Sequence, residues 1–432
     1  MNDAATAQAT APVSWRTRVH EQLLQTIDLR RRDLTRMSDQ DLRSETGRLV
    51  REIVAGLSNL PAEVDREHLV GAVLDEAIGL GPLEQLLRDE SVSEIMVNRH
   101  DEIFLERAGR IEQCDQVFSS DRAVRGVIER IVAPLGRRID ESSPMVDARL
   151  KDGSRVNAVI PPLSLKGPCL TIRKFARRRL GIRDLIDLGS LSPAMAAFLD
   201  LCVLHRRNIV VSGGTGSGKT TFLNVLSSCI PPGERIVTIE DAAELRLHHA
   251  NLVSLEARPA NAEGRGMVSI RDLVRNALRM RPDRIVVGEC RGGEALDMLQ
   301  AMNTGHEGSL TTLHANSPRD ALSRLETLVL MAGDSLPLAA IREQIASAVD
   351  IIVQQARFAC GSRRITSITE ICGTEGGRIQ MQEIFRFCRS SRRDSGQVLG
   401  TFSGCGCIPS FYESLRAQGE TLDLDCFGSC AS

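Results

Sequence analysis

The chain has 432 residues, of which 42% are hydrophobic and 25% charged, and its formal net charge is −2. This length and composition indicate a globular protein of roughly two to four domains. The near-neutral charge and the 3% share of aromatic residues argue against a surface built to bind nucleic acid, because such surfaces use basic grooves and stacked aromatic rings.

The first part of the chain is predicted to hold three segments. Residues 1–13, rich in Ala, Thr and Gln, are expected to be a disordered leader without the basic and apolar regions of a signal peptide. Residues 14–79 form a helical module by the spacing of their apolar residues. Residues 80–175 are predicted to be an α+β domain with a small sheet. Its elements are strands at 93–98 and 102–107, a helix at 122–132, a hairpin within 147–160 and a strand at 169–175.

The second part follows a linker predicted at 176–192. Residues 193–387 alternate between apolar strands and helices, which predicts a parallel α/β sheet. The strands are expected at 208–212, 235–240, 284–288, 309–313 and 350–354, and the helices at 221–229, 270–280, 295–302 and 318–331. Two further strands, at 364–371 and 378–387, are expected to close the sheet, and residues 388–432 are assigned to a C-terminal tail.

A glycine-rich loop follows the first strand of the second part. Residues 213–220 read G-G-T-G-S-G-K-T and match the phosphate-binding pattern G-x-x-x-x-G-K-[ST]. Such glycines let backbone N–H groups converge on phosphate oxygens at a helix N-terminus, where the helix dipole favours negative charge. Lys219 is expected to reach the β- and γ-phosphates, and the Thr220 hydroxyl to hold Mg²⁺. The predicted nucleotide-binding residues are Gly213, Gly214, Thr215, Gly216, Ser217, Gly218, Lys219, Thr220 and Thr221.

Two later strands end in carboxylates. Glu240 and Asp241 follow one apolar strand, with Glu244 beyond them, and Glu289 follows another. In an open α/β sheet the carboxyl ends of the strands face the ligand, so these acids are placed to position Mg²⁺ or an attacking water. The alternative is that they cap the helices that follow.

Histidines and arginines offer weaker signals. His306 and His314 flank a strand-like segment and are expected either to sense a γ-phosphate or to serve a structural role. Neither has cysteine partners at zinc spacing. Arg271, Arg275 and Arg279 lie at i, i+4 and i+8 on one predicted helix, which favours a solvated face, a contact with a neighbouring subunit or a lining of a central pore.

Four ordered motifs carry a specific resemblance. After the glycine-rich loop come E-D-A-A-E-L, R-P-D-R-I-V-V-G-E and N-T-G-H-E-G-S-L-T-T-L-H-A-N, in the order Asp box, atypical Walker B and His box. Over about residues 69–387 the chain resembles the secretion ATPase superfamily, which powers type II and type IV secretion and type IV pilus assembly. Within it, the chain is most similar to the CpaF-type ATPases of Tad (Flp) pilus systems.

The resemblance implies an N-terminal α/β domain, a linker and a RecA-like ATPase domain, assembled as a ring hexamer with nucleotide between subunits. It makes Glu240, in the same Asp box as Glu244, the general base or water-positioning residue. It makes Glu289 the Walker B acid near Mg²⁺, and it pairs His314 with His306 in the His box.

The resemblance also implies that arginines of the N-terminal domain reach the nucleotide. Arg149, Arg155 and Arg173 lie in stretches that match. An arginine donated across an interface stabilises transition-state charge by a factor of about 10³–10⁵ in rate. The alternative for each arginine is a surface ion pair. The expected catalytic residues are Glu240, Glu289, Lys219, His314 and Arg155, and Arg149 and Arg173 are expected to bind nucleotide.

The implied function is an ATPase motor that uses ATP and Mg²⁺ and works on an inner-membrane platform protein. Because no export signal and no apolar run of about 18 residues is found, we expect a cytoplasmic protein. It would bind the inner membrane peripherally, through partner proteins, and would bind no nucleic acid. The alternatives are a VirB-type conjugation or effector-export ATPase, a nucleic-acid-stimulated RecA-like motor, and a non-catalytic nucleotide-binding assembly module.

Cysteines crowd the end of the chain, at Cys388, Cys405, Cys407, Cys426 and Cys430. A cytoplasmic location predicts reduced thiols on a mobile tail. A zinc site and a redox-sensing pair are the alternatives, although the Cys405-x-Cys407 spacing is too short for the common zinc knuckle. Cys290, next to Glu289, is expected to be a small buried apolar residue.

Overall fold

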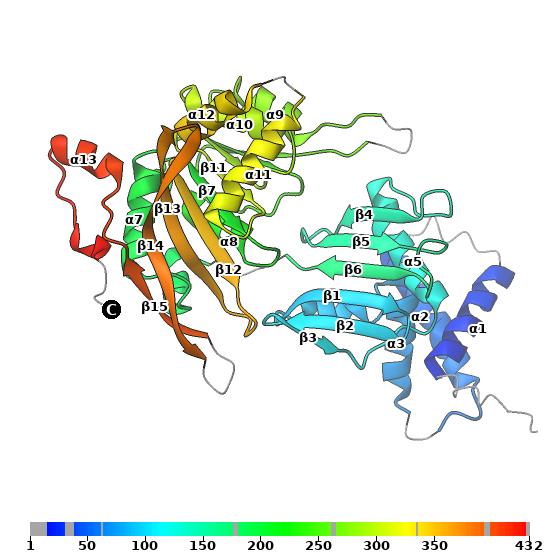
Figure 1. The fold of residues 1–432 in the computed structure, drawn as a ribbon. Helices are drawn as coiled ribbons and strands as arrows, with labels where there is room; N and C mark the ends of the chain where they lie inside the picture. Colours follow the sequence, from blue (N-terminus) through cyan, green and yellow to red (C-terminus); the bar gives the residue numbers. More distant parts are fainter. Residues whose placement is uncertain are drawn as a thin grey trace, which may run out of the picture. The chain divides into compact units, whose positions relative to one another are not determined.

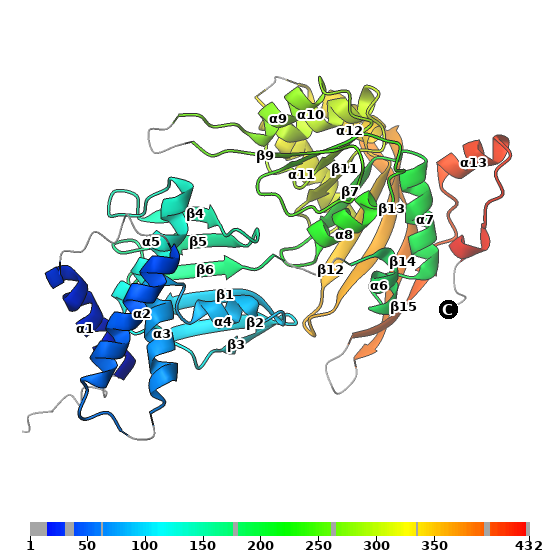
Figure 2. The same cartoon turned by 180° about the vertical axis from the view of Figure 1, so that it is seen from behind.

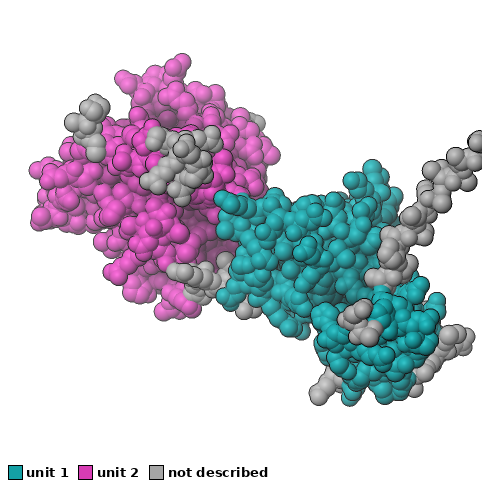
Figure 3. Space-filling model, turned by 90° about the horizontal axis from the view of Figure 1, so that it is seen from below, with its two compact units in different colours: residues 1–177 teal, residues 178–432 magenta. Residues whose placement is uncertain are grey.

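The computed structural model describes residues 15–30, 39–61, 64–175, 180–260, 265–333, 336–392 and 398–428. The predicted leader at 1–13 and Cys430 lie outside these residues. The chain divides into two compact units, residues 1–177 and 178–432, which are coloured separately in Figure 3. The division falls inside the segment predicted as a linker.

Unit 1 begins with three helices, as the apolar spacing predicted: α1 (Trp15–Arg30), α2 (Asp39–Ala55) and α3 (Arg66–Ile78). Their apolar faces meet in a small core of their own, because residues at helical spacing lie on one side of each helix. The buried members are Val19, Leu23, Leu49, Val50, Val54, Leu69, Val70 and Val73. The start of α3 is set by Asp65, whose carboxylate accepts the N–H groups of Glu67 and His68.

The rest of unit 1 is a six-stranded antiparallel sheet with the order β3-β2-β1-β6-β5-β4 (Figure 1). The two predicted hairpins are confirmed, and the first gains a third strand, β3, that the sequence analysis missed. The strands are β1 (Val92–Arg99), β2 (Glu102–Arg107), β3 (Arg110–Gln113), β4 (Met145–Arg149), β5 (Arg155–Val159) and β6 (Cys169–Arg173). Short helix α4 (Leu83–Arg88) and amphipathic α5 (Asp121–Val132) join them around one core.

Unit 2 starts with two helices, α6 (Ile182–Asp187) and α7 (Pro193–Leu204). Leu185 and Leu191 are buried in the core of unit 2, so the structure corrects the prediction of a linker that extends to residue 192. The apolar side chains of α6 are buried by the unit that follows, which is why this stretch is folded.

The sheet of unit 2 has nine strands in the order β15-β14-β13-β12-β7-β11-β10-β8-β9. The pairs from β12 to β9 are parallel and the pairs from β12 to β15 are antiparallel. The strands are β7 (Ile209–Gly213), β8 (Ile236–Glu240), β9 (Leu252–Glu256), β10 (Arg284–Val287), β11 (Leu310–Leu313), β12 (Ile351–Arg357), β13 (Arg363–Glu375), β14 (Arg378–Arg392) and β15 (Val398–Gly404). The predicted α/β class is confirmed.

Helices cover both faces of the parallel part of the sheet (Figures 1 and 2). Successive strand residues point to opposite faces. Ile209 and Val211 of β7 accordingly join one apolar core, and Val210 joins the other. The further helices are α8 (Lys219–Ser227), α9 (Ile270–Ala277), α10 (Glu294–Asn303), α11 (Pro318–Leu330) and α12 (Leu338–Ala348). Strand β9 and helix α12 were not predicted.

The end of the chain is not a separate tail, contrary to the prediction for residues 388–432. Strand β14 continues to Arg392, β15 pairs with it, and α13 (Ser410–Ala417) follows. Tyr412 and Phe427 pack with Phe198 of α7 and Phe385 of β14, with ring centroids 5.1–6.1 Å apart. These aromatic side chains bury a large apolar area, so this part of the segment folds onto unit 2.

Candidate nucleotide-binding site

The glycine-rich loop joins the buried strand β7 to the start of α8. Gly213 ends the strand, and a side chain there would collide with the carbonyl oxygen of Gln355 on β12 and lie 2.6 Å from Oγ of Ser217. Gly218 has a φ of 98°, a left-handed conformation that favours glycine, and stands just before the first residue of α8. The loop therefore presents backbone N–H groups at the N-terminus of a helix, which is the arrangement that binds phosphate.

The structure thus brings the predicted loop residues, 213–221, together in one turn and the first residues of α8. The Ser217 hydroxyl is buried and makes no hydrogen bond to protein among the described residues. The ammonium group of Lys219 is largely buried, and its Nζ donates to the carbonyl oxygen of Gly214 at 3.1 Å. These donors and the positive charge fit the phosphates of a nucleotide.

His314, Glu289 and Arg291 continue from Lys219 as a chain of contacts. Nζ of Lys219 lies 3.3 Å from Nδ1 of His314, and Nε2 of His314 lies 3.0 Å from Oε1 of Glu289. The other oxygen of Glu289 pairs with Arg291 at 2.7 Å. Partial burial and the nearby Lys219 ammonium lower the pKa of His314, so the neutral form of its ring is favoured at pH 7.

Glu240 lies at the carboxyl end of β8, next to the end of β10. It is buried, and its Oε1 accepts the backbone N–H groups of Glu244 and Leu245 at 2.8 and 3.0 Å. Its Cγ would lie 2.9 Å from a side chain built on Gly288, the residue before Glu289. Glu240 therefore caps the loop that leads to β9, not a helix as the structural alternative predicted, and it also stands beside the second acid-bearing strand.

The acids at the strand ends can hold a metal ion only together with a bound nucleotide. Glu289 has a largely buried carboxylate at the sheet edge, and the Thr220 hydroxyl belongs to the first turn of α8. A carboxylate and a hydroxyl are oxygen donors of the type that Mg²⁺ prefers, and Mg²⁺ is commonly completed by substrate phosphates and water. Within the described ranges, no three His, Cys, Asp or Glu side chains are grouped as a metal site of their own.

A polar cavity of about 350 Å³ adjoins His314. It lies between the loop after β11 and one side of α11, and its lining residues are His314, Ala315, Asn316, Asp320, Ser323, Arg324 and Thr327. His314 is thus the point where the contact chain from the glycine-rich loop reaches open space.

The three arginines predicted to bind nucleotide lie in unit 1, in one row across its sheet. Arg149 faces Arg155 on the neighbouring strand, and Arg155 faces Arg173 on the next. Side chains directly opposite each other on adjacent strands lie on the same face. The register therefore places the three arginines, which are separated by up to 24 residues in the chain, on one face; the hairpin of Arg149 and Arg155 was predicted, and its pairing with the strand of Arg173 was not.

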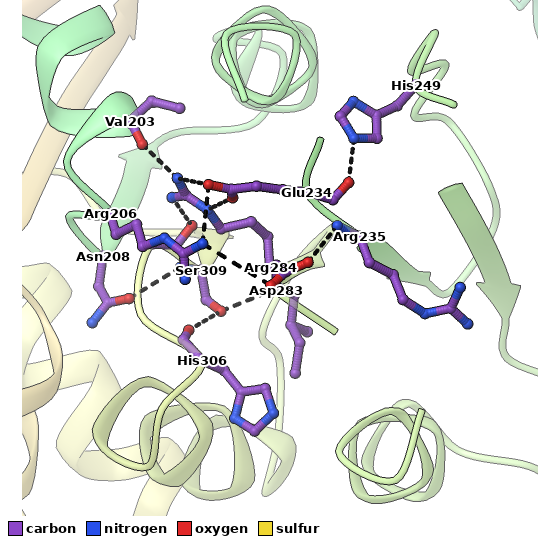
Figure 4. A network of polar contacts seen from close by, with 12 residues as sticks. Val203, Arg206, Asn208, Glu234, Arg235, His249, Asp283, Arg284, His306 and Ser309 are labelled. Carbon is purple, nitrogen blue, oxygen red and sulfur yellow. Dashed lines mark hydrogen bonds and ion pairs between the residues drawn. The ribbon is translucent and has the colours of Figure 1, made fainter. Parts of the chain in front are cut away.

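His306 is not part of the site. It precedes β11, at the amino end of the parallel strands, whereas His314 follows the carboxyl end of the same strand. Figure 4 shows its surroundings: the His306 carbonyl accepts the Ser309 hydroxyl at 2.7 Å, near the fully buried Arg284, which pairs with Glu234. Because β11 lies between them, the two histidines stand at opposite ends of that strand and do not meet within the chain, so the structural role that was the alternative fits His306.

The arginine stripe on α9 also has a structural role. Arg271 and Arg275 each donate to the buried carboxylate of Asp297 on α10, both at 2.7 Å. Neither side chain is simply solvated, and both contacts are made within the chain. A purely solvated face therefore does not describe these two residues, because each also pairs with Asp297, and a contact with a neighbouring subunit or a pore lining stays a prediction.

Cysteines of the described residues carry no disulfide. Cys290 is buried, as predicted, and burial raises its pKa to about 12. Among the last cysteines of the described chain, Cys388 lies on β14, Cys405 and Cys407 follow β15, and Cys426 lies in a 3-10 turn; burial raises the pKa of Cys405 and of Cys426.

Two arginines beside the glycine-rich loop were missed. Nε of Arg363 donates to the carbonyl oxygen of Gly216 at 2.9 Å, and Nη1 of Arg357 would lie 3.1 Å from a side chain built on Gly216. Both belong to the hairpin between β12 and β13. The only signal in the sequence is the turn C-G-S between two strands, which does not reveal that β12 lies beside β7.

A glycine-rich phosphate loop beside two acid-bearing strands of a parallel sheet defines a P-loop nucleotide-binding protein. The family described as Type II/IV secretion system protein matches residues 76–413 of the chain. The chain therefore belongs to this family, and its predicted place in the secretion ATPase superfamily, with a RecA-like ATPase domain, is confirmed. No helix among the described residues is both long and apolar enough to span a bilayer.

Relatives of the chain include conjugation and secretion proteins. A putative conjugal transfer protein of Mycobacterium tuberculosis is 40% identical over 75% of this chain and 93% of its own length. The conjugal transfer protein TrbB of Rhizobium radiobacter is 36% identical over 68% of this chain and 88% of its own. The type IV secretion system protein PtlH of Bordetella pertussis is 39% identical over 66% of this chain and 91% of its own.

Solved structures with similarity to the chain include the VirB11 ATPase of the Brucella suis type IV secretion system. It is 33% identical, with 66% of this chain and 94% of that chain covered and a TM-score of 0.37. The pilus retraction motor PilT with bound ADP is 20% identical, with 70% of this chain and 80% of that chain covered and a TM-score of 0.48.

Proposed function

We propose that the protein is a Mg²⁺-dependent ATPase that powers assembly of a type IV pilus of the Tad (Flp) type or transport by a type II/IV secretion system. The observation that carries the proposal is the contact chain Lys219–His314–Glu289, which joins the glycine-rich loop to the Walker B acid through the His box. A protein that only bound nucleotide would not need these groups in contact.

Each residue has a role that follows from its position. The loop amides and Lys219 bind the phosphates, and Thr220 and Glu289 hold Mg²⁺, which would neutralise charge on the phosphate oxygens. Glu240 positions or deprotonates the attacking water. His314 contacts both Lys219 and Glu289 and also lines the cavity beside α11. We therefore expect a change in the bound phosphates to alter that cavity through His314.

Arg149, Arg155 and Arg173 are proposed to complete the site across a subunit interface of a homo-hexamer. Three arginines in one cross-strand row, with Glu94 facing Arg173 on β1, concentrate positive charge on one face of the sheet, so a further anionic group is favoured there. A triphosphate from a neighbouring subunit is such a group. Arg155, in the middle of the row, is the residue we expect to stabilise charge in the transition state.

The working environment is also a proposal. We place the motor in the cytoplasm, bound peripherally to the inner membrane through a platform protein, and we expect no nucleic-acid partner. Hydrolysis would move unit 1 against unit 2 and so transmit force to that platform. The near-neutral charge of −2 supports a protein partner over a nucleic acid.

A conjugation or effector-export ATPase of the VirB type is the second candidate. It is favoured by the three relatives named above, which are conjugal transfer and type IV secretion proteins. The two candidates share the same chemistry at the P-loop. Deleting the gene in its host separates them, because one predicts loss of pili and the other predicts loss of conjugation or effector export.

The enzymatic proposal is tested by ATP turnover of the wild type, Lys219→Ala and Arg155→Ala, alone and mixed, with size measured by light scattering. We expect a hexamer, no turnover in either variant alone, and partial recovery on mixing, because a mixed ring holds some interfaces with both residues intact. Arg110→Ala, an exposed arginine on the edge strand β3 of the same sheet, is the matched control and should keep full turnover.

Three results would overturn parts of this proposal. Turnover by a monomer that is indifferent to Arg155→Ala would remove the shared site and leave a Mg²⁺-dependent nucleoside triphosphatase. A tenfold rise in turnover on adding DNA or RNA would favour the nucleic-acid-stimulated motor. Nucleotide binding without any turnover would favour the non-catalytic assembly module.

A further inference from the structure

The hairpin between β12 and β13 stands directly beside the glycine-rich loop. Strand β12 runs parallel to β7, with Gln355 paired to Gly213 at the point where the loop begins. The chain then turns tightly, since Gly361 donates to the Phe358 carbonyl at 2.8 Å and Phe358 donates to the Ser362 carbonyl at 2.9 Å. This turn places Arg357 and Arg363 opposite each other at the carboxyl end of β12.

Both Arg357 and Arg363 lie against the glycine-rich loop, at Gly216 and Gly218. Nε of Arg363 donates to the carbonyl oxygen of Gly216 at 2.9 Å. Cδ of Arg363 would lie 3.1 Å from a side chain on Gly218, and Nη1 of Arg357 would lie 3.1 Å from one on Gly216. The two glycines have φ angles of 69° and 98°, so the loop makes two left-handed steps where the arginines lie against it.

The hydrogen bond from Arg363 determines where the next N–H group points. In a planar trans peptide the C=O of one residue and the N–H of the next point in opposite directions. Because the Gly216 carbonyl is held toward the hairpin, the Ser217 N–H points into the loop, where it donates to the Gly214 carbonyl at 3.3 Å. That carbonyl also accepts Nζ of Lys219 at 3.1 Å.

A bound phosphate requires the same donors, the Ser217 N–H and Nζ of Lys219, to point into the loop. With the Gly216 carbonyl held outward, the Ser217 N–H lies on the inner side of the loop together with Nζ of Lys219, and donors gathered in this way are how such loops bind anions; here both donate to the Gly214 carbonyl, whose place a phosphate oxygen would take. A free loop with two left-handed glycines has many other conformations, because glycine loses more backbone entropy on ordering than other residues. The hydrogen bond from Arg363 selects the binding conformation before the ligand arrives.

We propose that Arg363 is a positioning residue of the nucleotide site, which orients the amides of the glycine-rich loop through the Gly216 carbonyl. The proposal rests on nucleotide binding at this loop, and it adds the β12–β13 hairpin to the elements that build the site. Its action depends on a donor at the position of Nε, and the charge of the guanidinium group is secondary.

Three substitutions separate the donor from the charge. In Arg363→Gln, Nε2 stands the same number of bonds from Cα as Nε of arginine, so it keeps the donor and removes the charge. Arg363→Met has a similar length and removes both. Arg378→Met is the matched control, because Arg378 is an exposed arginine at the next hairpin of the same sheet.

The measurement is the Kd of the full chain for a fluorescent ADP analogue, read by anisotropy and checked by thermal unfolding. We expect Arg363→Met to bind about tenfold more weakly, the effect of one hydrogen bond, and Arg363→Gln and Arg378→Met to stay within about threefold of the wild type. Melting temperatures should agree among the variants, because Arg363 is exposed and its partner is in a surface loop.

Equal weakening in Arg363→Gln and Arg363→Met would overturn the proposal, since it would show that charge alone acts. Wild-type affinity in Arg363→Met would also overturn it. Lys219→Ala distinguishes this failure from failure of the proposed function. If that variant binds the analogue as tightly as the wild type, the loop is not the nucleotide site and both proposals fall together.

Discussion

Glu240 is held by two backbone hydrogen bonds that a glutamine can also accept. Its Oε1 receives the N–H groups of Glu244 and Leu245, and the Oε1 of glutamine occupies the same position. Glu240→Gln should therefore keep the fold and lose the base. We expect turnover to fall by a factor of about 10²–10⁴, the range of general base catalysis, while affinity for ADP is unchanged.

Glu240→Ala is the comparison variant. It removes the acceptor as well as the base, and it leaves two buried N–H groups without a partner, so its melting temperature should fall while that of Glu240→Gln does not. Turnover and thermal unfolding of the two variants are measured together. Wild-type turnover in Glu240→Gln would show that Glu240 only caps the loop and that the base is another residue.

At the scale of single elements, Arg130 ties helix α5 to the C-terminal end of α3. Its guanidinium group donates to the carbonyl oxygens of Glu76, Ala77 and Gly79 at 2.7, 3.1 and 2.8 Å. These carbonyls lie at a helix end, where intrahelical partners are lacking and a cation is favoured. We expect Arg130→Met to destabilise unit 1 by about 2–3 kcal/mol, because three buried acceptors lose a charged donor.

The only tryptophan of the chain, Trp15, makes this prediction measurable in the full-length protein. Trp15 lies on α1 and packs against the core of the three-helix part of unit 1, so its fluorescence in urea follows that unit. Arg125→Met on the same helix is the control, since Arg125 makes only an exposed pair with Glu129 and should cost less than about 1 kcal/mol. A similar shift for both variants would contradict the role of Arg130.

The predicted elements agree with the structure where their own residues carry the pattern. The strands around the P-loop are short apolar runs, and α5 has apolar residues at helical spacing, so both were found. Strand β9 was missed because its burial is only partial along an edge of the sheet. Helix α12 was missed because it follows another helix and not a strand, which breaks the strand–helix alternation. Its apolar residues are buried against α10 and β13, which the sequence does not reveal.

At the scale of the whole molecule, the two units have separate cores. The two large apolar cores that lie on either face of the nine-stranded sheet draw all their members from residues after Arg178. We therefore expect a fragment of residues 178–432 to fold alone and to unfold cooperatively on heating, because a core of this size is sufficient for a domain. Circular dichroism and light scattering measure this.

The same fragment tests the shared site. It should bind the fluorescent ADP analogue through the glycine-rich loop and should not hydrolyse ATP, because Arg155 is absent from it. An aggregated or non-cooperative fragment would show that unit 1 is needed for folding. Full turnover by the folded fragment would contradict the role proposed for the arginine row.

The sequence alone was sufficient for the motifs whose residues are neighbours in the chain. The loop at 213–220, the acids at strand ends and the α/β class follow from short-range spacing, because phosphate binding and strand formation depend on consecutive residues. Arg155, Arg149 and Arg173 were selected through the family resemblance, and their roles stay predictions.

Only the tertiary structure decided which distant residues meet. The strand order puts β12 beside β7, so Arg363 reaches the glycine-rich loop. Strand β11 lies between His306 and His314 and so places them at its opposite ends. The pairing of Arg271 and Arg275 with Asp297 likewise depends on how α9 packs on α10. Strand order and helix packing depend on burying the apolar residues of both faces of the sheet at the same time. No short stretch of the sequence contains that information, because the residues involved are distant in the chain.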